Sequence, residues 1–458
     1  MVAQIQKSLR DSKSARWVAL IIVSFTMLCG YYFTEAMSPL KGLLENELSW
    51  SSTEFGFYTG AYGLFNVFLL MLIIGGVILD KRGVRFSGRM ATVMMVLGAV
   101  VKYWAITTHA LDGQSWTLLW MTAKAQVWMA GLGFAIFGVG VEIAGITVSK
   151  IIVKWFKGRE MALAMGMEMA MARIGTGLAM GFSLPIANSF QLSTPVLLGL
   201  ILLCIGLISF VIYTFQDKKL DQEIAAEQSV EEDGFKMRDI VGIFTNKGWW
   251  YIAILCVLFY SAVFPFIKYA TDLMIQKFHV NPNFAGAIPS LLPFGNILLT
   301  PFFGNLYDRR GKGATIMIIG SIMLIGVHLL FSVPMLDSWW MAVVLIITLG
   351  VAFSLVPSAM WPSVPKIIPE KQLGTAYSMI FWVQNIGLMC VPMLIGWILD
   401  KYCIINKVLP DGSIQKYDYT LPMLVFASFG ALALIFAFLL KAEDKRKGYG
   451  LEKPNIQK

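Results

Sequence analysis

Two oppositely charged side chains lie deep inside apolar stretches of the sequence. Arg173 follows Glu160, at the start of one stretch, by thirteen residues, which is about 20 Å along a helix. Glu142 precedes Lys150, at the end of the preceding stretch, by eight residues, or about 12 Å. Charges at such depth are usually functional. Arginine binds a carboxylate and glutamate binds an ammonium group, so the two residues predict a site for a small zwitterion.

The same two charges allow a purely structural interpretation. The helices that carry Glu142 and Arg173 are joined by a short turn, 151–159, and are therefore expected to be antiparallel neighbours. The side chains can then form a static ion pair that only fixes packing. Glu168 lies five residues from Arg173, about 140° around the helix, so we expect it to face a different partner and assign it no role.

Further polar and aromatic residues are predicted around this site. The eleventh apolar stretch contains Asn385 two residues before Gly387, and the fifth contains Arg173 two residues before Gly175. Aligning the two glycines places Asn385 opposite Arg173, so one wall is charged and the other forms hydrogen bonds. The other candidate contacts are Gln384, Tyr31, Tyr32, Trp361 and Tyr377. For any single aromatic residue, ordinary packing or anchoring at the membrane interface is the competing interpretation.

Three more basic residues fall inside apolar stretches but nearer to their ends. Lys102, Lys124 and Lys268 can extend their long side chains to the interface, and Asp272 lies one helical turn from Lys268. We therefore predict structural roles for these three lysines.

One short pattern occurs twice, half a chain apart. Residues 76–85 read Gly-x-x-x-Asp-(Lys/Arg)-x-Gly-x-Arg, and residues 304–312 repeat most of it 228 residues later. Each copy lies between two apolar stretches. Internal duplication in an apolar chain is typical of transporters built from two similar halves. A positively charged turn that only sets membrane orientation is the simpler alternative.

The repeated turns are predicted to form a gating latch. We expect the first glycine to let the second and eleventh helices approach closely, the aspartate to form a cap or ion pair, and the basic residues to hold the loop against neighbouring helix ends. The residues concerned are Gly76, Asp80, Lys81, Gly83 and Arg85 in the first copy and Gly304, Asp308 and Arg309 in the second.

The composition indicates that a lipid bilayer surrounds the chain. Of its 458 residues, 57% are apolar and only 14% are charged, whereas about 25% of residues are charged in soluble domains. The net charge of +9 does not indicate nucleic-acid binding, because the basic residues lie in short turns between apolar stretches. The five cysteines and three histidines form no metal-ligand spacing. No cofactor and no enzymatic activity are predicted.

Hydrophobic stretches predict an all-α membrane protein with twelve transmembrane helices in two pseudo-symmetric six-helix bundles. The expected bundles are residues 1–216 and 249–458, joined by a cytoplasmic linker, 217–248. Basic residues number 28 on one side and five on the other, which predicts that both termini are cytoplasmic. The helices are expected at 17–38, 55–79, 87–108, 119–149, 160–188, 194–216, 249–275, 285–307, 313–334, 338–361, 373–400 and 419–441.

The repeated turn resembles the loop motif of the major facilitator superfamily, and the twelve helices in a 6+6 arrangement extend the resemblance over the whole chain. Other stretches resemble the branch of this superfamily formed by lysosomal dipeptide transporters. They are residues 154–160, 171–175, 262–267, 359–362, 373–377 and 384–387.

This resemblance implies passage of dipeptides by alternating access of the two bundles. It also implies that Glu142, Arg173 and Trp361 contact the substrate. The sequence contains no glycosylation sequon and no acidic dileucine signal. We therefore expect a bacterial relative that works as a monomer in the inner membrane.

Two transporter hypotheses remain from the sequence. The first is a carrier of zwitterions such as dipeptides, and a carboxylate in its cavity could also couple transport to protons. The second is a carrier of small organic or inorganic anions, of the monocarboxylate or nitrate type, anchored by Arg173. A receptor or scaffold is disfavoured because the longest loop has only about thirty residues. Uniport and symport are not distinguished.

Overall fold

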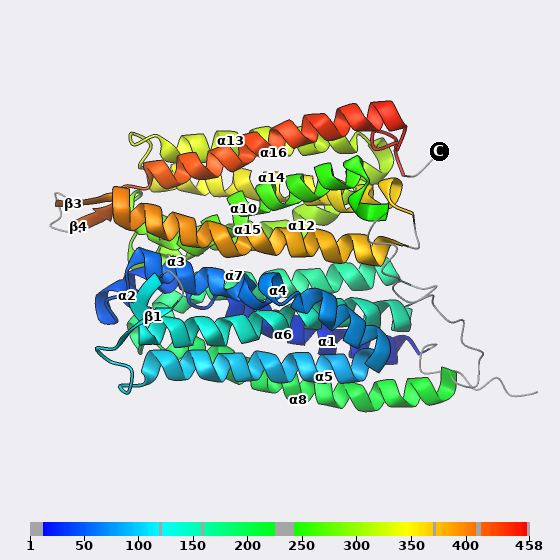
Figure 1. The fold of residues 1–458 in the computed structure, drawn as a ribbon, viewed down its shortest axis with the longest axis horizontal. Coiled ribbons are helices and arrows are strands. Elements are labelled where there is room, and N and C mark those ends of the chain that lie inside the picture. Colours follow the sequence, from blue (N-terminus) through cyan, green and yellow to red (C-terminus); the bar gives the residue numbers. More distant parts are fainter. Residues whose placement is uncertain are drawn as a thin grey trace, which may run out of the picture.

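Long helices dominate the structure. The computed structural model describes residues 12–118, 121–156, 160–224, 242–369, 372–408 and 414–455. The helices lie side by side along one direction (Figure 1). In this described part, eleven helices are long and apolar enough to cross a membrane. The predicted all-α membrane fold is confirmed.

In its described residues, the first half of the chain contains eight α-helices, two 3-10 helices and one short hairpin. In order, its elements are α1 (Lys13–Glu35), η1 (Ser38–Leu40), α2 (Lys41–Glu47), α3 (Ser52–Gly60), η2 (Ala61–Gly63), α4 (Leu64–Phe68), α5 (Met71–Thr107), β1 (Ser115–Leu118), β2 (Met121–Lys124), α6 (Ala125–Phe156), α7 (Met161–Ser189) and α8 (Thr194–Ile224).

The second half repeats this plan of long helices with a hairpin. In order, its elements are α10 (Lys247–Gln276), α11 (Pro282–Ala285), α12 (Ala287–Arg310), α13 (Gly313–Ser332), α14 (Trp339–Ile367), α15 (Leu373–Tyr402), β3 (Ile404–Val408), β4 (Ile414–Tyr417) and α16 (Thr420–Lys447).

The helix α5 contains two membrane crossings. Its 37 residues would span about 55 Å as one straight helix, whereas a bilayer core is about 30 Å thick. The helix breaks at Gly83, where φ is 75° and ψ is 174°. The part before Gly83 completes the second crossing, which α3, η2 and α4 begin. With α5 counted as two crossings, the eleven apolar helices of the described residues give the predicted twelve crossings.

The predicted start of the fourth helix, at residue 119, is wrong. The structure forms a β-hairpin there, in which Ser115 pairs with Lys124 and Leu118 with Met121, and α6 begins only at Ala125. β-branched threonines favour the extended strands, and the hydroxyls of Thr117 and Thr122 lie 2.8 Å apart across the hairpin.

The sixth helix is longer than predicted. It was expected to end at residue 216, but α8 continues to Ile224, into the stretch expected to be a linker. Asp217 is fully buried there and accepts hydrogen bonds from Lys154 and Trp155 of α6 and from Tyr213 of α8. The first two bonds tie the extension of α8 to α6. Within the expected linker, residues 225–241 lie outside the described part of the chain.

Both β-hairpins lie at one end of the molecule, which we call the hairpin end (Figure 1). The beginning of α1 and the end of α16 lie at the opposite end, the termini end. At the hairpin end, Asp400 of α15 accepts hydrogen bonds from the backbone amides of Ser52 and Thr53, at 3.0 and 2.5 Å. These amides begin α3, so a carboxylate from one half caps a helix of the other.

Close backbone contact continues from there along α3 and α15. A Cβ atom on Gly396 would lie 2.1 Å from the Ser52 carbonyl oxygen, and one on Gly60 would lie 2.3 Å from that of Met389. On the other side of the interface, Asn188 of α7 donates a hydrogen bond of 2.9 Å to Asn283 of α11. The two halves are therefore packed tightly toward the hairpin end.

The contact ends part-way to the termini end. Near the end of this contact, the Trp382 indole of α15 donates a hydrogen bond of 3.1 Å to the Val67 carbonyl in the second crossing. The chain then bends at Leu70, whose φ of 52° is rare for a leucine. Beyond this bend, a Cβ atom on Gly76 would have nothing within 4 Å, and Gly304 is equally open. The predicted packing of Gly76 against the eleventh helix is therefore wrong for this conformation.

Candidate binding cavity

A cavity lies between the two halves of the chain, about midway along their helices. Its walls come from α1, α3, η2, α6 and α7 on one side and from α10, α12 and α15 on the other. The polar residues that line it are Tyr31, Thr34, Glu35, Thr59, Tyr62, Glu142, Arg173, Thr176, Lys268 and Gln384.

Arg173 reaches this cavity from the middle of α7. The helix packs closely on α1, because a Cβ atom on Gly175 would lie 2.2 Å from the Leu28 carbonyl oxygen. The half-buried guanidinium of Arg173 lies 5.3 Å from the ring centre of Phe353, across the interface in α14. It forms no ion pair with a carboxylate of the described residues. A half-buried cation without a counterion can bind an anionic group.

Glu142 lines the same cavity from α6. Its carboxylate accepts a hydrogen bond of 2.9 Å from the hydroxyl of Tyr62. The structure shows no ion pair between Glu142 and Arg173, so the expected direct pair is absent from this conformation. Tyr62 was not predicted, because nothing in its apolar stretch distinguishes it from other membrane aromatics.

The structure brings only some of the predicted contacts to the cavity. Arg173, Glu142, Tyr31 and Gln384 line it, and Gln384 accepts a hydrogen bond from the Cys256 thiol at 3.5 Å. Asn385 is buried, and its side-chain nitrogen donates to the Phe381 carbonyl at 3.0 Å instead of facing Arg173. Tyr32 is buried inside the first half, against Ala36 and Ala179.

Trp361 and Tyr377 belong to an aromatic cluster beside the cavity. The Trp361 indole donates a hydrogen bond of 3.1 Å to the Tyr260 hydroxyl, and the Tyr377 hydroxyl donates one of 3.1 Å to the Trp361 carbonyl. Tyr260 also packs on Phe353, with ring centres 5.7 Å apart. Because Phe353 also packs against Arg173, Trp361 contacts the arginine only indirectly, through the rings of Tyr260 and Phe353.

The sequence did not indicate a binding role for two charged residues of the cavity. Lys268 of α10 forms an ion pair of 2.8 Å with Glu35 of α1, and both side chains line the cavity. The expected neighbour Asp272 pairs instead with Lys41, at 3.0 Å. Neither partner could be inferred from sequence, because each pair joins the two halves of the chain.

Lys102 does not reach the interface as predicted. Its side chain is fully buried, with the ammonium 4.2 Å from the ring centre of Phe33 and 4.5 Å from that of Phe134. Aromatic faces attract a cation and replace part of its hydration. The prediction of an interfacial lysine overlooked this ring cluster inside the first half.

The two repeated turns share their backbone but not their contacts. Gly83 and Gly311 both have a positive φ, 75° and 68°, which explains a glycine at this position of each turn. In the first turn, Asp80 pairs with Lys150 of α6 at 2.6 Å, and Arg85 pairs with Asp221 of α8 at 2.9 Å.

In the second turn, the contacts of the aspartate and of the nearby lysine come from the chain segment after α16. Asn455 donates a hydrogen bond of 2.7 Å to the carboxylate of Asp308. Lys366, near the end of α14, donates to the carbonyls of Gly450 and Lys453 at 3.1 and 3.0 Å. The segment after α16 thus supplies the partner of Asp308, whereas the matching Asp80 of the first turn pairs directly with a lysine of α6. Lys81 and Arg309 are exposed.

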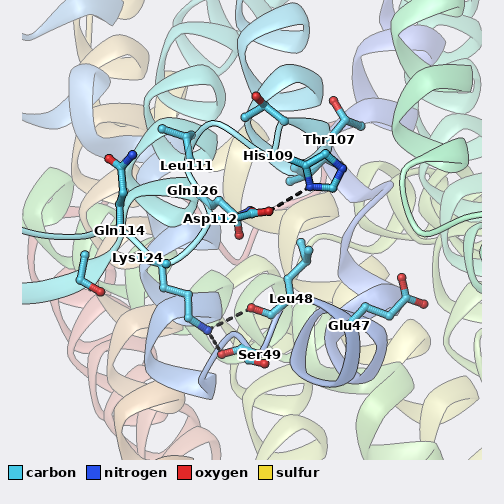
Figure 2. Close-up of a pocket in the computed structure, with 14 residues that line it drawn as sticks. Glu47, Leu48, Ser49, Thr107, His109, Leu111, Asp112, Gln114, Lys124 and Gln126 are labelled. Carbon is cyan, nitrogen blue, oxygen red and sulfur yellow. Dashed lines mark hydrogen bonds and ion pairs between the residues drawn. The ribbon is translucent and has the colours of Figure 1, made fainter.

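A second pocket opens at the hairpin end, away from the central cavity. Figure 2 shows that Lys124 points to the carbonyls of Leu48 and Ser49, to which its ammonium donates hydrogen bonds. His109 pairs with Asp112 at 2.9 Å, but its side chain is 96% exposed. Among the described residues no group of three metal-ligating side chains occurs here or elsewhere. The contacts of Lys124 therefore fix loops.

Comparison with known proteins identifies the family. The profile of the Major Facilitator Superfamily matches residues 23–273 and 253–455, which together cover most of the chain. The chain belongs to the Major Facilitator Superfamily. It is therefore a membrane transporter of small molecules and not an enzyme.

Curated relatives within this superfamily include a lysosomal dipeptide transporter, MFSD1. The protein from Bos taurus is 27% identical over 396 residues, which cover 84% of this chain and 80% of the relative. The protein from Gallus gallus is 31% identical over 283 residues, covering 60% and 63%. A probable peptide/nitrate transporter from Arabidopsis thaliana is 25% identical over 198 residues, covering 42% and 39%. The predicted resemblance is confirmed.

Solved structures of the superfamily share the fold. The nucleoside transporter NupG superimposes with a TM-score of 0.67 at 16% identity, covering 93% of this chain and 98% of that one. A bacterial homolog of the human lysosomal transporter Spinster, in an inward-facing and occupied conformation, gives 0.66 at 14% identity, covering 94% and 98%. These likenesses confirm the predicted two-bundle architecture.

Proposed function

We propose that this transporter carries small zwitterionic solutes, most simply dipeptides, and that Arg173 and Glu142 bind their two charged ends. The observation that carries the proposal is the half-buried guanidinium of Arg173, which faces the cavity without an ion-pair partner among the described residues. A substrate carboxylate supplies that partner, and Glu142 in the same cavity supplies one for an ammonium group. The relatives named as dipeptide transporters support this choice of solute.

The remaining polar groups fit the same solute. Gln384 lines the cavity from the second half and offers an amide to a peptide bond. We assign Trp361 and Tyr377 to positioning Phe353 and Tyr260 beside Arg173, and Asn385 and Tyr32 to packing around the site. No nucleic acid and no cofactor take part in this proposal.

Transport in this proposal follows from alternate opening of the two ends. The first half, which ends with α8 at Ile224, and the second half, which begins with α10 at Lys247, move as two bundles. In the present conformation the hairpin end is closed by Asp400 and by the glycine contacts of α3 with α15. Gly76 and Gly304 come into contact only when the termini end closes. From the distribution of basic residues, we place the termini end in the cytoplasm and the protein in the inner membrane.

A second candidate is transport of small anions. It is supported by the same unpaired Arg173 and by the relative named as a probable peptide/nitrate transporter. Under this hypothesis the amino group of the solute is irrelevant, and Glu142 acts in proton coupling or packing.

Thermal stabilisation of the purified protein separates the two candidates. A ligand present at about 100 times its Kd stabilises the folded state by about 2.7 kcal/mol, which raises the melting temperature measurably. We expect dipeptides to raise it and monocarboxylates and nitrate, which lack an ammonium group for Glu142, to leave it unchanged. Stabilisation by the small anions alone would support the second candidate.

The first repeated turn provides a prediction about gating. We expect Asp80→Asn to slow dipeptide uptake by about two- to fivefold without lowering expression, because it breaks the pair with Lys150. Both side chains are partly exposed, so the pair contributes about 1 kcal/mol at most. The measurement is the initial uptake rate per amount of protein in the membrane. Asp308→Asn is the matched control, since its partner is the neutral Asn455. Wild-type uptake in the Asp80 variant would remove the latch role.

A further inference from the structure

An ion pair joins the two halves of the transporter inside the cavity. The Lys268 ammonium lies 2.8 Å from a carboxylate oxygen of Glu35 and also donates to the Thr34 carbonyl at 3.2 Å. The second carboxylate oxygen of Glu35 accepts a hydrogen bond of 2.7 Å from the Ser38 hydroxyl. Only 10% of the lysine side chain and 6% of the glutamate side chain are exposed. The pair is thus largely withdrawn from water, and both members line the same cavity as Arg173 and Glu142.

The pair lies between the Arg173–Glu142 level and the hairpin end. Glu35 is the last residue of α1 and follows the cavity residue Tyr31 by one turn, about 6 Å farther toward the hairpin end. One turn beyond Lys268, Asp272 pairs with Lys41 at 3.0 Å, again across the two halves. Lys41 and Asp272 are buried but do not line the cavity. The first pair can meet a solute, whereas the second can only hold the halves together.

Opening of the hairpin end must separate Glu35 from Lys268, because they belong to halves that move apart. Separation leaves two charges in a largely desolvated place, which is strongly unfavourable unless new partners replace the old ones. A zwitterionic solute entering from this end carries both replacements, a carboxylate for the lysine and an ammonium for the glutamate. The charges of Glu35, Lys268, Glu142 and Arg173 sum to zero, which suits a solute of zero net charge.

We propose that Glu35 and Lys268 are a second charge-recognition subsite, which is occupied by the ion pair when the hairpin end is closed and by the solute when it is open. Lys268 receives the carboxylate and Glu35 the ammonium before these groups pass to Arg173 and Glu142. The inference rests on the proposed zwitterionic solute. It makes the inner ion pair a specificity-determining element and the outer Lys41–Asp272 pair a lock without a role in recognition.

The test compares the KM and maximal rate of dipeptide uptake from the hairpin side for matched variants. We expect Glu35→Gln and Lys268→Met each to raise KM at least tenfold, and Lys268→Arg, which keeps the charge, to raise it less than threefold. Asp272→Asn breaks the outer pair and is expected to change the maximal rate with KM within about threefold. Elution of each purified variant as a single monodisperse peak establishes that it is folded.

The double variant Glu35→Lys with Lys268→Glu distinguishes recognition from locking. It reverses the pair, so we expect it to restore closure but not KM, because a bound solute would then face Arg173 and Glu142 with the wrong ends. Closure is read from labelling of a Leu388→Cys reporter in the cavity by an impermeant maleimide, in a background with Cys390→Ser and Cys204→Ser.

Three results would overturn the inference. Recovery of both closure and KM in the reversed variant would make the pair a lock alone. A KM within threefold of wild type in both single variants would remove the recognition role while leaving the proposed function intact. Failure of the wild-type protein to take up or bind any dipeptide would overturn the proposed function itself and this inference with it.

Discussion

Arg173→Ala is expected to weaken dipeptide binding at least about 30-fold and to abolish measurable uptake. Removing one partner of a desolvated charge pair generally costs about 2 kcal/mol or more, which corresponds to this factor in Kd. The side chain faces the cavity, lies 5.3 Å from the ring centre of Phe353 and has no competing carboxylate partner among the described residues. Its full interaction is therefore available to a solute. Titration of the melting temperature with dipeptide measures the change in affinity.

Two further variants show whether the charge or the shape of Arg173 matters. Arg173→Lys keeps the charge but loses the planar pair of donors, so we expect an intermediate loss of about five- to tenfold. Arg446→Ala removes an arginine that pairs with Glu443 near the end of α16, far from the cavity, and should leave binding unchanged. Equal binding by wild type and Arg173→Ala would contradict the assigned site.

Glu142→Gln is expected to weaken dipeptide binding by about tenfold or more and to remove the preference for a free amino terminus. Wild-type protein should bind an N-acetylated dipeptide far more weakly than the free dipeptide, because acetylation removes the ammonium that Glu142 is proposed to bind. In the variant the two peptides should bind alike. The ratio of the two Kd values is the quantity to measure.

Tyr62→Phe is the matched control for Glu142. It removes the hydrogen bond of 2.9 Å to the carboxylate but keeps the charge. The Tyr62 hydroxyl only orients the carboxylate, so its loss should lower affinity about fivefold, or about 1 kcal/mol, with the preference for a free amino terminus preserved. An undiminished preference in Glu142→Gln would show that the ammonium binds elsewhere, for example at Glu35.

The fold could be predicted largely from the sequence because the bilayer imposes a length and a polarity on each helix. Apolar stretches located the crossings, and the two glycine-containing turns revealed the duplication. The bend at Leu70 and the hairpin at 115–124 could not be predicted in this way. No glycine or proline marks the bend, and each hairpin strand has only four residues, which is too short for hydrophobic periodicity to separate it from the start of the following helix.

The site was only partly predictable, for a different physical reason. Arg173 and Glu142 could be identified because the depth of a residue in the membrane follows from its position along a single helix. Partners across the two halves cannot be inferred from local spacing. Asp272 lies one turn from Lys268 in the sequence, yet the ion-pair partner of Lys268 is Glu35, 233 residues away. The sequence also does not determine which way each helix is turned about its own axis. The glycine alignment placed Asn385 opposite Arg173, but its side chain donates a hydrogen bond to the Phe381 carbonyl.

The most direct test of the central claim is uptake of a labelled dipeptide into vesicles that contain only the purified transporter. We predict saturable uptake that an unlabelled dipeptide inhibits, that nitrate does not inhibit, and that is lost in Arg173→Ala. Vesicles that take up nitrate or a monocarboxylate but no dipeptide, or an Arg173→Ala variant that transports as fast as wild type, would contradict the account.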